Sequence, residues 1–367
     1  MSFLAFDEPR PGDKPIRVMI VDDSAIMRGL LAHWLEKEPG VEVVARHANG
    51  KIAAEDVRQS APDIVLLDIE MPVMDGLEAL PLLLKARPET RVLMVSSLTK
   101  RNAEISFKAL SLGAIDYVPK PDTSLETTLS ADFRDEVVRK VRALGRKRPA
   151  PGKGRERAAA PRSIASLRRS FSLVPPRAIA IGSSTGGPQI LGRVLETLSA
   201  SLSRVPVLVA QHMPPMFTTV LAERLARATG REAKEGSDGE VIKPGIIYVA
   251  PGGLHMTVVG ADAPAIRLGN EPPANFCRPA VDPLFKSVAA SFGAAALGIV
   301  LTGMGHDGAA GARAIAEAGG SVIAQDEASS VVWGMPGAAA SVGACAAVLP
   351  PAEIAETAAK LVRGVRS

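Results

Sequence analysis

Two regions of the chain alternate short apolar runs with longer amphipathic stretches. In the first region the apolar runs predict strands, and the stretches between them predict helices. Five β/α units in this order predict a doubly wound parallel sheet with helices on both faces. The predicted strands are residues 18–21, 41–44, 64–67, 92–95 and 117–118, and the predicted helices are residues 24–37, 50–59, 76–86, 101–112 and 131–144.

The second region repeats the pattern and predicts a second doubly wound α/β layer fold. Two further runs, residues 255–259 and 266–268, predict an edge hairpin. We therefore expect an N-terminal domain over residues 15–144, a linker over 145–176 and a C-terminal domain over 177–367. The strands predicted for the last of these are residues 179–181, 205–210, 246–249, 297–301 and 322–324.

Acidic residues follow two strands of the first domain. Asp22 and Asp23 come after the first strand, and Asp68 comes after the third. In a parallel sheet these positions meet at the carboxyl edge, where ligands bind. Three carboxylates repel one another unless a cation neutralises them, and oxygen ligands suit Mg²⁺. Asp22 and Asp23 taken alone favour a helix cap. Ser96 and Lys120, after the fourth and fifth strands, add a hydroxyl and a positive charge to the same edge, which makes a cap improbable for the set.

These positions resemble those of a two-component receiver domain. The resemblance covers the whole first domain and implies a flavodoxin-like fold. It further implies phosphorylation of Asp68 by a histidine kinase, with Mg²⁺ held by Asp22, Asp23 and Asp68. Ser96, Lys120 and Tyr117 are implied as the residues that switch upon phosphorylation. The resemblance rests on Val21-Asp22-Asp23-Ser24, the segment 68–76 (DIEMPVMDG), Ser96-Ser97 and Lys120-Pro121.

Ser184 lies where the first strand of the second domain meets a helix, in the segment 179–188 (IAIGSSTGGP). Glycines permit a sharp turn there, and Gly182-x-Ser184-x-Gly186 matches the nucleophile-elbow pattern. Such a serine attacks a carbonyl when a base and an oxyanion site are near. The pattern alone favours a plain glycine turn or a phosphate cradle, so the nucleophile hypothesis needs partners elsewhere in the chain.

A base and an acid follow other strands of that domain. His212 comes directly after the run 205–210, on the same predicted edge as Ser184. Asp307 lies in a glycine-rich turn after the run 297–301, where Met304 N–H can face an oxyanion. The order Ser, His, Asp differs from that of the standard α/β-hydrolase fold. It does not argue against triad chemistry, which depends on geometry. A metal pair of Asp307 with His306 lacks a third partner.

These segments resemble the CheB methylesterase domain from about residue 177 to 362. The resemblance implies Ser184 as nucleophile, His212 as base and Asp307 as orienting acid. Thr185 and Met304 become neighbours of the oxyanion site, and Arg278 belongs to the substrate region. Two positions depart from the family pattern, namely Met216, where we expect glycine, and His306. The segments concerned are 182–187 (GSSTGG), 211–215 (QHMPP), 278–282 (RPAVD), 301–308 (LTGMGHDG) and 334–336 (GMP).

The whole chain thus resembles a phosphorylation-activated hydrolase of glutamate methyl esters on chemoreceptors that releases methanol. Glutamine deamidation is implied as a second activity. The implied partners are methyl-accepting chemoreceptors and a histidine kinase, and the esterase step needs no cofactor. We expect the unphosphorylated receiver to cover the Ser184 edge and phosphorylation to favour an open arrangement. The alternative is a non-catalytic interaction module behind a receiver, against which Ser184, His212 and Asp307 together argue.

Composition and charge argue against a membrane protein, a secreted protein and a nucleic-acid-binding protein. Hydrophobic residues make up 47% of the 367 residues, but no apolar run reaches the length of a membrane span. The acidic N-terminal segment lacks an apolar core, so we expect no secretory leader. The net charge is +4, but residues 146–169 carry +8, which leaves −4 on the rest. A local basic segment does not indicate nucleic-acid binding by the folded domains. Cys277 and Cys345 lack metal-site spacing and indicate reduced thiols in a cytoplasmic protein.

Overall fold

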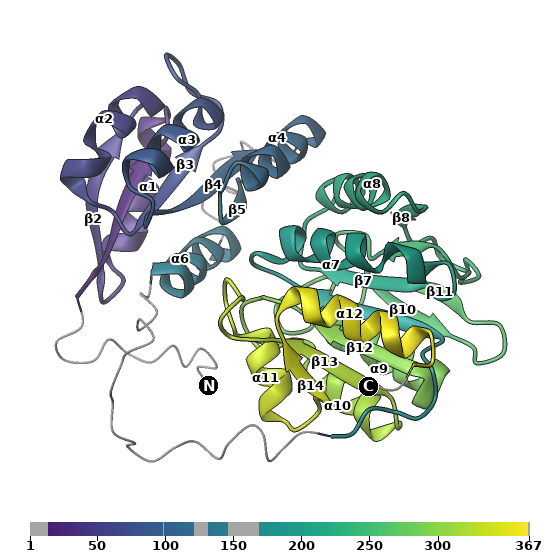
Figure 1. The fold of residues 1–367 in the computed structure, drawn as a ribbon. Helices are drawn as coiled ribbons and strands as arrows, with labels where there is room; N and C mark the ends of the chain where they lie inside the picture. The colour runs from purple at the N-terminus through teal and green to yellow at the C-terminus, as the bar shows by residue number, and fades with distance from the viewer. Residues whose placement is uncertain (1–13, 98, 121–130, 146–168, 366–367) are drawn as a thin grey trace, which may run out of the picture. The chain divides into compact units, whose positions relative to one another are not determined.

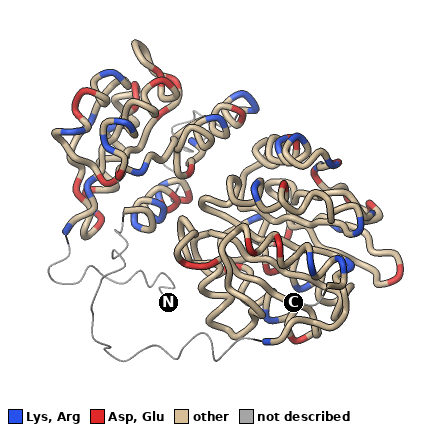
Figure 2. Tube along the Cα trace, viewed as in Figure 1, with Lys and Arg blue, Asp and Glu red and all other residues tan. Residues whose placement is uncertain are grey.

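Figure 1 shows the computed structural model, which describes residues 14–97, 99–120, 131–145 and 169–365. The chain divides into two compact units, Met1–Lys153 and Gly154–Ser367, and each is described by itself. Most of the predicted linker, residues 146–168, lies outside the described residues. Lys, Arg, Asp and Glu are interspersed along the described chain of both units (Figure 2).

The first unit is a five-stranded parallel sheet in the order β2-β1-β3-β4-β5. This is the flavodoxin-like order, in which ligands bind at the carboxyl edge where the order reverses. The predicted fold is confirmed. The strands are β1 (Ile16–Val21), β2 (Val41–His47), β3 (Ile64–Asp68), β4 (Arg91–Ser97) and β5 (Asp116–Lys120).

Helices cover both faces of this sheet (Figure 1). One face carries α1 (Ala25–Glu36) and α6 (Ala131–Gly145), and the other carries α2 (Gly50–Ser60), α3 (Gly76–Ala86) and α4 (Lys100–Ser111). All five residues of the central strand β3 are buried. Burial of one large apolar side chain contributes about 1.5–3 kcal/mol, so the central strands anchor the acidic edge.

Ser24, and neither Asp22 nor Asp23, caps the helix that follows β1. Its side chain accepts a hydrogen bond from Met27 N, 3.3 Å away, at the first turn of α1. Asp22 Oδ1 instead accepts from Ser24 N at 2.9 Å and fixes the loop. The cap function considered for the two aspartates is therefore performed by their neighbour, which leaves the aspartates for another function.

The second unit contains a seven-stranded parallel sheet in the order β14-β13-β12-β6-β7-β9-β8. A separate antiparallel hairpin is formed by β10 (His255–Val259) and β11 (Ala265–Gly269), as predicted. The two short edge strands β8 and β14 are not predicted by the apolar pattern. The strands of the sheet are β6 (Ala178–Ser183), β7 (Val207–Gln211), β8 (Ala233–Glu235), β9 (Ile247–Val249), β12 (Ala296–Val300), β13 (Ser321–Gln325) and β14 (Ala347–Leu349).

Two helical layers enclose this sheet (Figure 1). One layer consists of α7 (Gly187–Leu202), α8 (Phe217–Thr229) and α12 (Pro351–Val362). The other consists of α9 (Val281–Phe292), α10 (Ala309–Glu317) and α11 (Met335–Ser341), with a short 3₁₀ turn at Gly293–Ala295 after α9. The doubly wound fold predicted for this region is confirmed. None of the helices in the described residues is both long and apolar enough to cross a membrane.

Met216, at the position where the family pattern suggests glycine, has a left-handed backbone angle. Its φ is 71° directly before α8, and its side chain is 42% exposed. A Cβ in this conformation is strained, so we expect Met216→Gly to raise the free energy of unfolding by about 1 kcal/mol. Urea denaturation of the full chain measures this change.

Met216→Ala is the matched control for that prediction, because it removes the same exposed side chain but keeps the Cβ. If both variants change the free energy of unfolding equally, backbone strain is not the cause.

Candidate functional site

The first unit brings three predicted acids together at its carboxyl edge. Ligand oxygens of Asp22, Asp23 and Asp68 all lie within 4.8 Å of one another. Lys120 Nζ lies 2.8 Å from Asp22 Oδ2 and 2.7 Å from Asp68 Oδ2. The edge is therefore an acidic cluster with one ammonium group inserted into it.

The carboxyl group of Asp68 has a raised pKa. Burial raises the pKa of its carboxyl to about 6; the positive charge of Lys120 opposes this shift, and the negative charge of Asp22 adds to it. Burial lowers the pKa of Lys120, but the charges of Asp68 and Asp22 raise it above its ordinary value. A carboxylate that is costly to ionise among like charges is the setting that a bound cation stabilises. The donor set, three carboxylates with oxygen ligands only, fits a hard divalent cation.

The other receiver residues lie on β4 and β5 and are buried or half-buried. Ser96 Oγ is 3.0 Å from Ser106 Oγ of α4, and both side chains are buried. Tyr117 is 4% exposed, and Lys140 Nζ of α6 lies 5.3 Å from the centre of its ring. These contacts link the acidic edge to α4 and α6. The switch roles of Ser96, Tyr117 and Lys120 stay predictions.

The turn that carries Ser184 follows β6 in the second unit. Ser184 N donates to Thr302 O at 3.0 Å, and Gly187 N donates to Ser184 O at 2.7 Å. Gly186 has φ 73°, which glycine adopts without strain. A Cβ on Gly303 would lie 2.9 Å from the Cβ of Ser184, so only glycine fits there. The turn leaves Ser184 half-buried, while Ser183 and Thr185 are fully buried.

Gln211, which the sequence did not single out, joins this turn to the end of β7. Its side-chain Oε1 accepts from Ser183 Oγ at 2.5 Å, and its Nε2 donates to Ser184 O at 3.0 Å. His212 N in turn donates to Ser183 O at 3.1 Å. The backbones of Ser184 and His212 are therefore held side by side. The sequence shows only a glutamine directly after an apolar run, which does not indicate that its side chain joins two strand ends.

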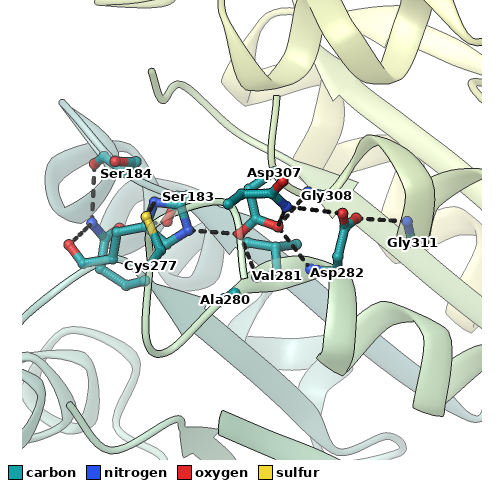
Figure 3. A network of polar contacts seen from close by, with 12 residues as sticks. Ser183, Ser184, Cys277, Ala280, Val281, Asp282, Asp307, Gly308 and Gly311 are labelled. Atoms are coloured by element: carbon teal, nitrogen blue, oxygen red, sulfur yellow. Dashed lines mark hydrogen bonds and ion pairs between the residues drawn. The ribbon is translucent and has the colours of Figure 1, made fainter. Parts of the chain in front are cut away.

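His212 and Asp307 form a direct pair, with His212 Nε2 2.8 Å from Asp307 Oδ2. Figure 3 shows the carboxylate of Asp307 at the start of α9, facing Val281 and Asp282. The positive end of the helix dipole favours an anion there. Beyond His212, the carboxylate accepts hydrogen bonds from the backbone N–H groups of Val281, Asp282 and Gly308 and from the side chain of Asn275.

These contacts fix the charge of the pair. Burial raises the pKa of Asp307, but the hydrogen bond and charge of His212 outweigh burial and hold that pKa below its ordinary value. An ionised Asp307 accepts the Nε2 proton of His212, which leaves Nδ1 as the basic nitrogen of the neutral ring. This contact is the one that an orienting acid makes, and that role for Asp307 stays a prediction.

The third member of the predicted triad is near but not bonded. Within the described residues, Ser184 Oγ makes no hydrogen bond. Nδ1 of His212 instead faces the sulfur of Cys277, 3.3 Å away. The structure thus brings His212 and Asp307 into contact and leaves Ser184 at the adjoining strand end. Catalytic hydrogen bonds of this kind often form only with substrate in place.

The remaining site residues lie around this edge. Thr185 Oγ1 is buried without a hydrogen-bond partner among the described residues, which suits a donor awaiting an oxyanion. Met304 is half-buried in the turn before Asp307. The guanidinium of Arg278 donates to the carbonyls of Asn270 and Glu271, so the contacts described here are structural. The roles of all three in catalysis stay predictions.

Other histidines have separate environments. His306 is exposed, while its neighbour Asp307 is buried. His255 of β10 is buried and bonds to backbone atoms of Ala280 and Pro272.

Comparison with known proteins finds a matching family for each of the two units. The family described as CheB methylesterase matches residues 179–358, and the response regulator receiver domain family matches residues 18–129. A protein-glutamate methylesterase/protein-glutamine glutaminase of Rhodopseudomonas palustris (strain HaA2) is 52% identical over 96% of both chains. One of Paramagnetospirillum magneticum is 49% identical over 98% of this chain and 99% of its own. The crystal structure of the Thermotoga maritima CheB methylesterase catalytic domain covers 52% of this chain and all of its own, at 38% identity and a TM-score of 0.49.

Fold and site define a response regulator: a receiver with an acidic carboxyl edge, joined in the chain to an α/β domain with a His–Asp pair beside a serine turn. Within that class, the chain belongs to the CheB methylesterase family, whose relatives it matches along nearly its whole length.

Proposed function

We propose that this protein is a phosphorylation-activated hydrolase that removes methyl esters from glutamate side chains of chemoreceptors and deamidates receptor glutamines. The observation that carries the proposal is 52% identity across 96% of the chain to a relative with that name. The His212–Asp307 pair at the Ser184 edge supplies the matching chemistry. We also propose a cytoplasmic location, and a histidine kinase as the phosphodonor of the receiver domain.

The proposed reaction uses Ser184, His212 and Asp307 in sequence. Ser184 Oγ attacks the ester carbonyl while His212 Nδ1 takes its proton, and Asp307 stabilises the ring through Nε2. His212 then returns that proton to the departing methoxide, and methanol leaves. Water, activated by the same nitrogen, hydrolyses the acyl-enzyme to a glutamate carboxylate. Thr185 and Met304 N–H are the proposed neighbours of the oxyanion, with Arg278 in the substrate region.

The first unit is the proposed regulator of the esterase activity. We propose that Asp68 accepts the phosphoryl group, with Mg²⁺ held by Asp22, Asp23 and Asp68. Mg²⁺ bound there would neutralise charge on the phosphoryl oxygens. Lys120 and Ser96 contact the modified group in this proposal, and Tyr117 responds to it. We place the receiver at residues 15–144, the linker at 145–176 and the hydrolase at 177–367.

Methanol release tests the proposed function. We expect the full chain to release methanol from methylated receptor, and to do so faster with Mg²⁺ and a small phosphodonor. If purified protein releases no methanol under either condition, the proposal is wrong and a non-catalytic interaction module remains.

A further inference from the structure

A four-residue turn outside the predicted triad places two polar side chains on the His212–Asp307 pair. Ala274 and Cys277 exchange backbone hydrogen bonds of 3.1 and 2.9 Å, which close the turn. The two central residues, Asn275 and Phe276, have φ values of 51° and 64°. Positive φ at both positions is usual for glycine and asparagine and unfavourable for phenylalanine. Strain of this kind persists where the surroundings fix a functional geometry.

Asn275 connects this turn to Asp307. Its Nδ2 donates to Asp307 Oδ1 at 2.9 Å and to Asp282 Oδ2 at 3.1 Å. Asp282 Oδ1 accepts from Gly311 N at 2.7 Å. A neutral amide thus stands between two buried carboxylates that would otherwise repel each other. The side chain fixes the orientation of Asp307 without adding charge.

Cys277 connects the same turn to His212. Its sulfur lies 3.3 Å from Nδ1, and Nε2 of the same ring lies 2.8 Å from Asp307. Carboxylate, imidazole and thiol form one continuous chain, to which the turn contributes at both ends (Figure 3). Nδ1 has a single lone pair, so the thiol of Cys277 and the hydroxyl of Ser184 cannot both donate to it.

We propose that the 274–277 turn is a positioning element of the esterase site, in which Cys277 orients His212 and shares a proton with its Nδ1 while Asn275 orients Asp307. The catalytic consequence rests on the proposed function, whereas the thiol–imidazole pair does not. When the proton moves from sulfur to Nδ1, a thiolate and an imidazolium face each other, and His212 is unavailable as a base. When the proton returns to sulfur, Nδ1 can accept from Ser184 in exchange for Cys277.

The charges around His212 determine the direction in which its pKa is shifted. Burial lowers the pKa of His212, but negative charge on Cys277 and the hydrogen bond that His212 donates to Asp307 raise it above its ordinary value, to about 10. The carboxylate of Asp282 contacts Asn275, whose amide separates it from Asp307. Arg278, next to Cys277, donates to backbone carbonyls instead. His255 likewise bonds to backbone atoms.

The positioning role is tested by two variants that should shift the acid limb of the pH–activity profile in opposite directions. Activity needs neutral His212, so it rises as pH passes upward through the His212 pKa. Cys277→Ala removes a negative charge, so we expect the acid limb of kcat/KM to move down by about one pH unit or more. Asn275→Asp adds a negative charge beside Asp307, so the limb should move up. Cys277→Ser retains a donor to Nδ1 and should retain more of the wild-type kcat than Cys277→Ala.

Phe276→Ala is the matched control from the tip of the same turn, because its side chain is 78% exposed. It should leave the pH limb where the wild type has it. A turn with only a structural role would give shifts of the same sign, or none, in Cys277→Ala and Asn275→Asp, and either result overturns the proposal.

Alkylation of the full chain by iodoacetamide tests the thiol–imidazole pair without any esterase assay. The reagent forms an S–C bond as iodide leaves, and it reacts with thiolate, which a neighbouring imidazolium favours. At about pH 6.5 we expect Cys277 to be alkylated at least about tenfold faster in the wild type than in His212→Gln. Buried Cys345 serves as the internal standard for folding. Equal Cys277 rates in the two proteins would overturn the pair, whether or not methanol is released.

Discussion

Replacing Ser184 with alanine should lower methanol release from methylated receptor by at least about a thousandfold, because the hydroxyl is the proposed nucleophile. The backbone around it is fixed by Gln211, Thr302 and Gly187, and those contacts do not use the Ser184 side chain. The variant should therefore fold and bind receptor like the wild type. Methanol release with a phosphodonor present measures the effect, and a melting curve checks the fold.

The matched control for Ser184→Ala is His306→Ala. His306 is exposed and adjacent to Asp307, so its loss should leave the rate within about twofold of the wild type. His212→Gln should instead approach the loss seen for Ser184→Ala, because residues of one catalytic unit give non-additive effects. Activity that survives in Ser184→Ala would assign the nucleophile elsewhere.

Asp68→Asn should abolish stimulation by the phosphodonor while leaving the basal rate measurable. Its carboxylate ends β3, lies 2.7 Å from Lys120 Nζ and shares the edge with Asp22 and Asp23. An amide at this position cannot form the acyl phosphate, and it removes one charge from the cation site. The ratio of methanol release with and without phosphodonor should fall to about one.

Asp75→Asn is the matched control for that variant, since it changes an aspartate that follows the same strand. Asp75 caps α3 in a reciprocal box with Glu78, so its role is structural. Its substitution should cost at most about 1 kcal/mol of stability and preserve the stimulation. Equal loss of stimulation in both variants would mean that general damage to the receiver, and not phosphorylation of Asp68, explains the effect.

The central part of both sheets was predictable because its strands are buried on both faces. A strand such as β3, with every residue buried, appears in the sequence as a continuous apolar run. The edge strands β8 and β14 have only three residues each and are partly exposed, so they lack that signal. The acids, His212 and Asp307 were found because parallel strands end at one edge.

The contacts around His212 were not predictable in the same way. Cys277 meets a ring that lies 65 residues earlier in the chain, through a turn that has no glycine despite two positive φ angles. Gln211 was hidden by its position at the end of an apolar strand. The local pattern of apolar and polar residues predicts where strands end. It does not predict which side chain of a distant loop faces Nδ1 of His212.

Covalent labelling of the full chain by a fluorophosphonate addresses most directly whether Ser184, His212 and Asp307 work together. The reagent forms an O–P bond with an activated serine as fluoride leaves, and mass spectrometry locates the adduct. We predict one adduct on Ser184 in the wild type and none on Ser184 in His212→Gln or Asp307→Ala. A wild-type protein that releases methanol but carries its adduct on Cys277, or carries none, would show that the esterase chemistry has been assigned to the wrong side chains.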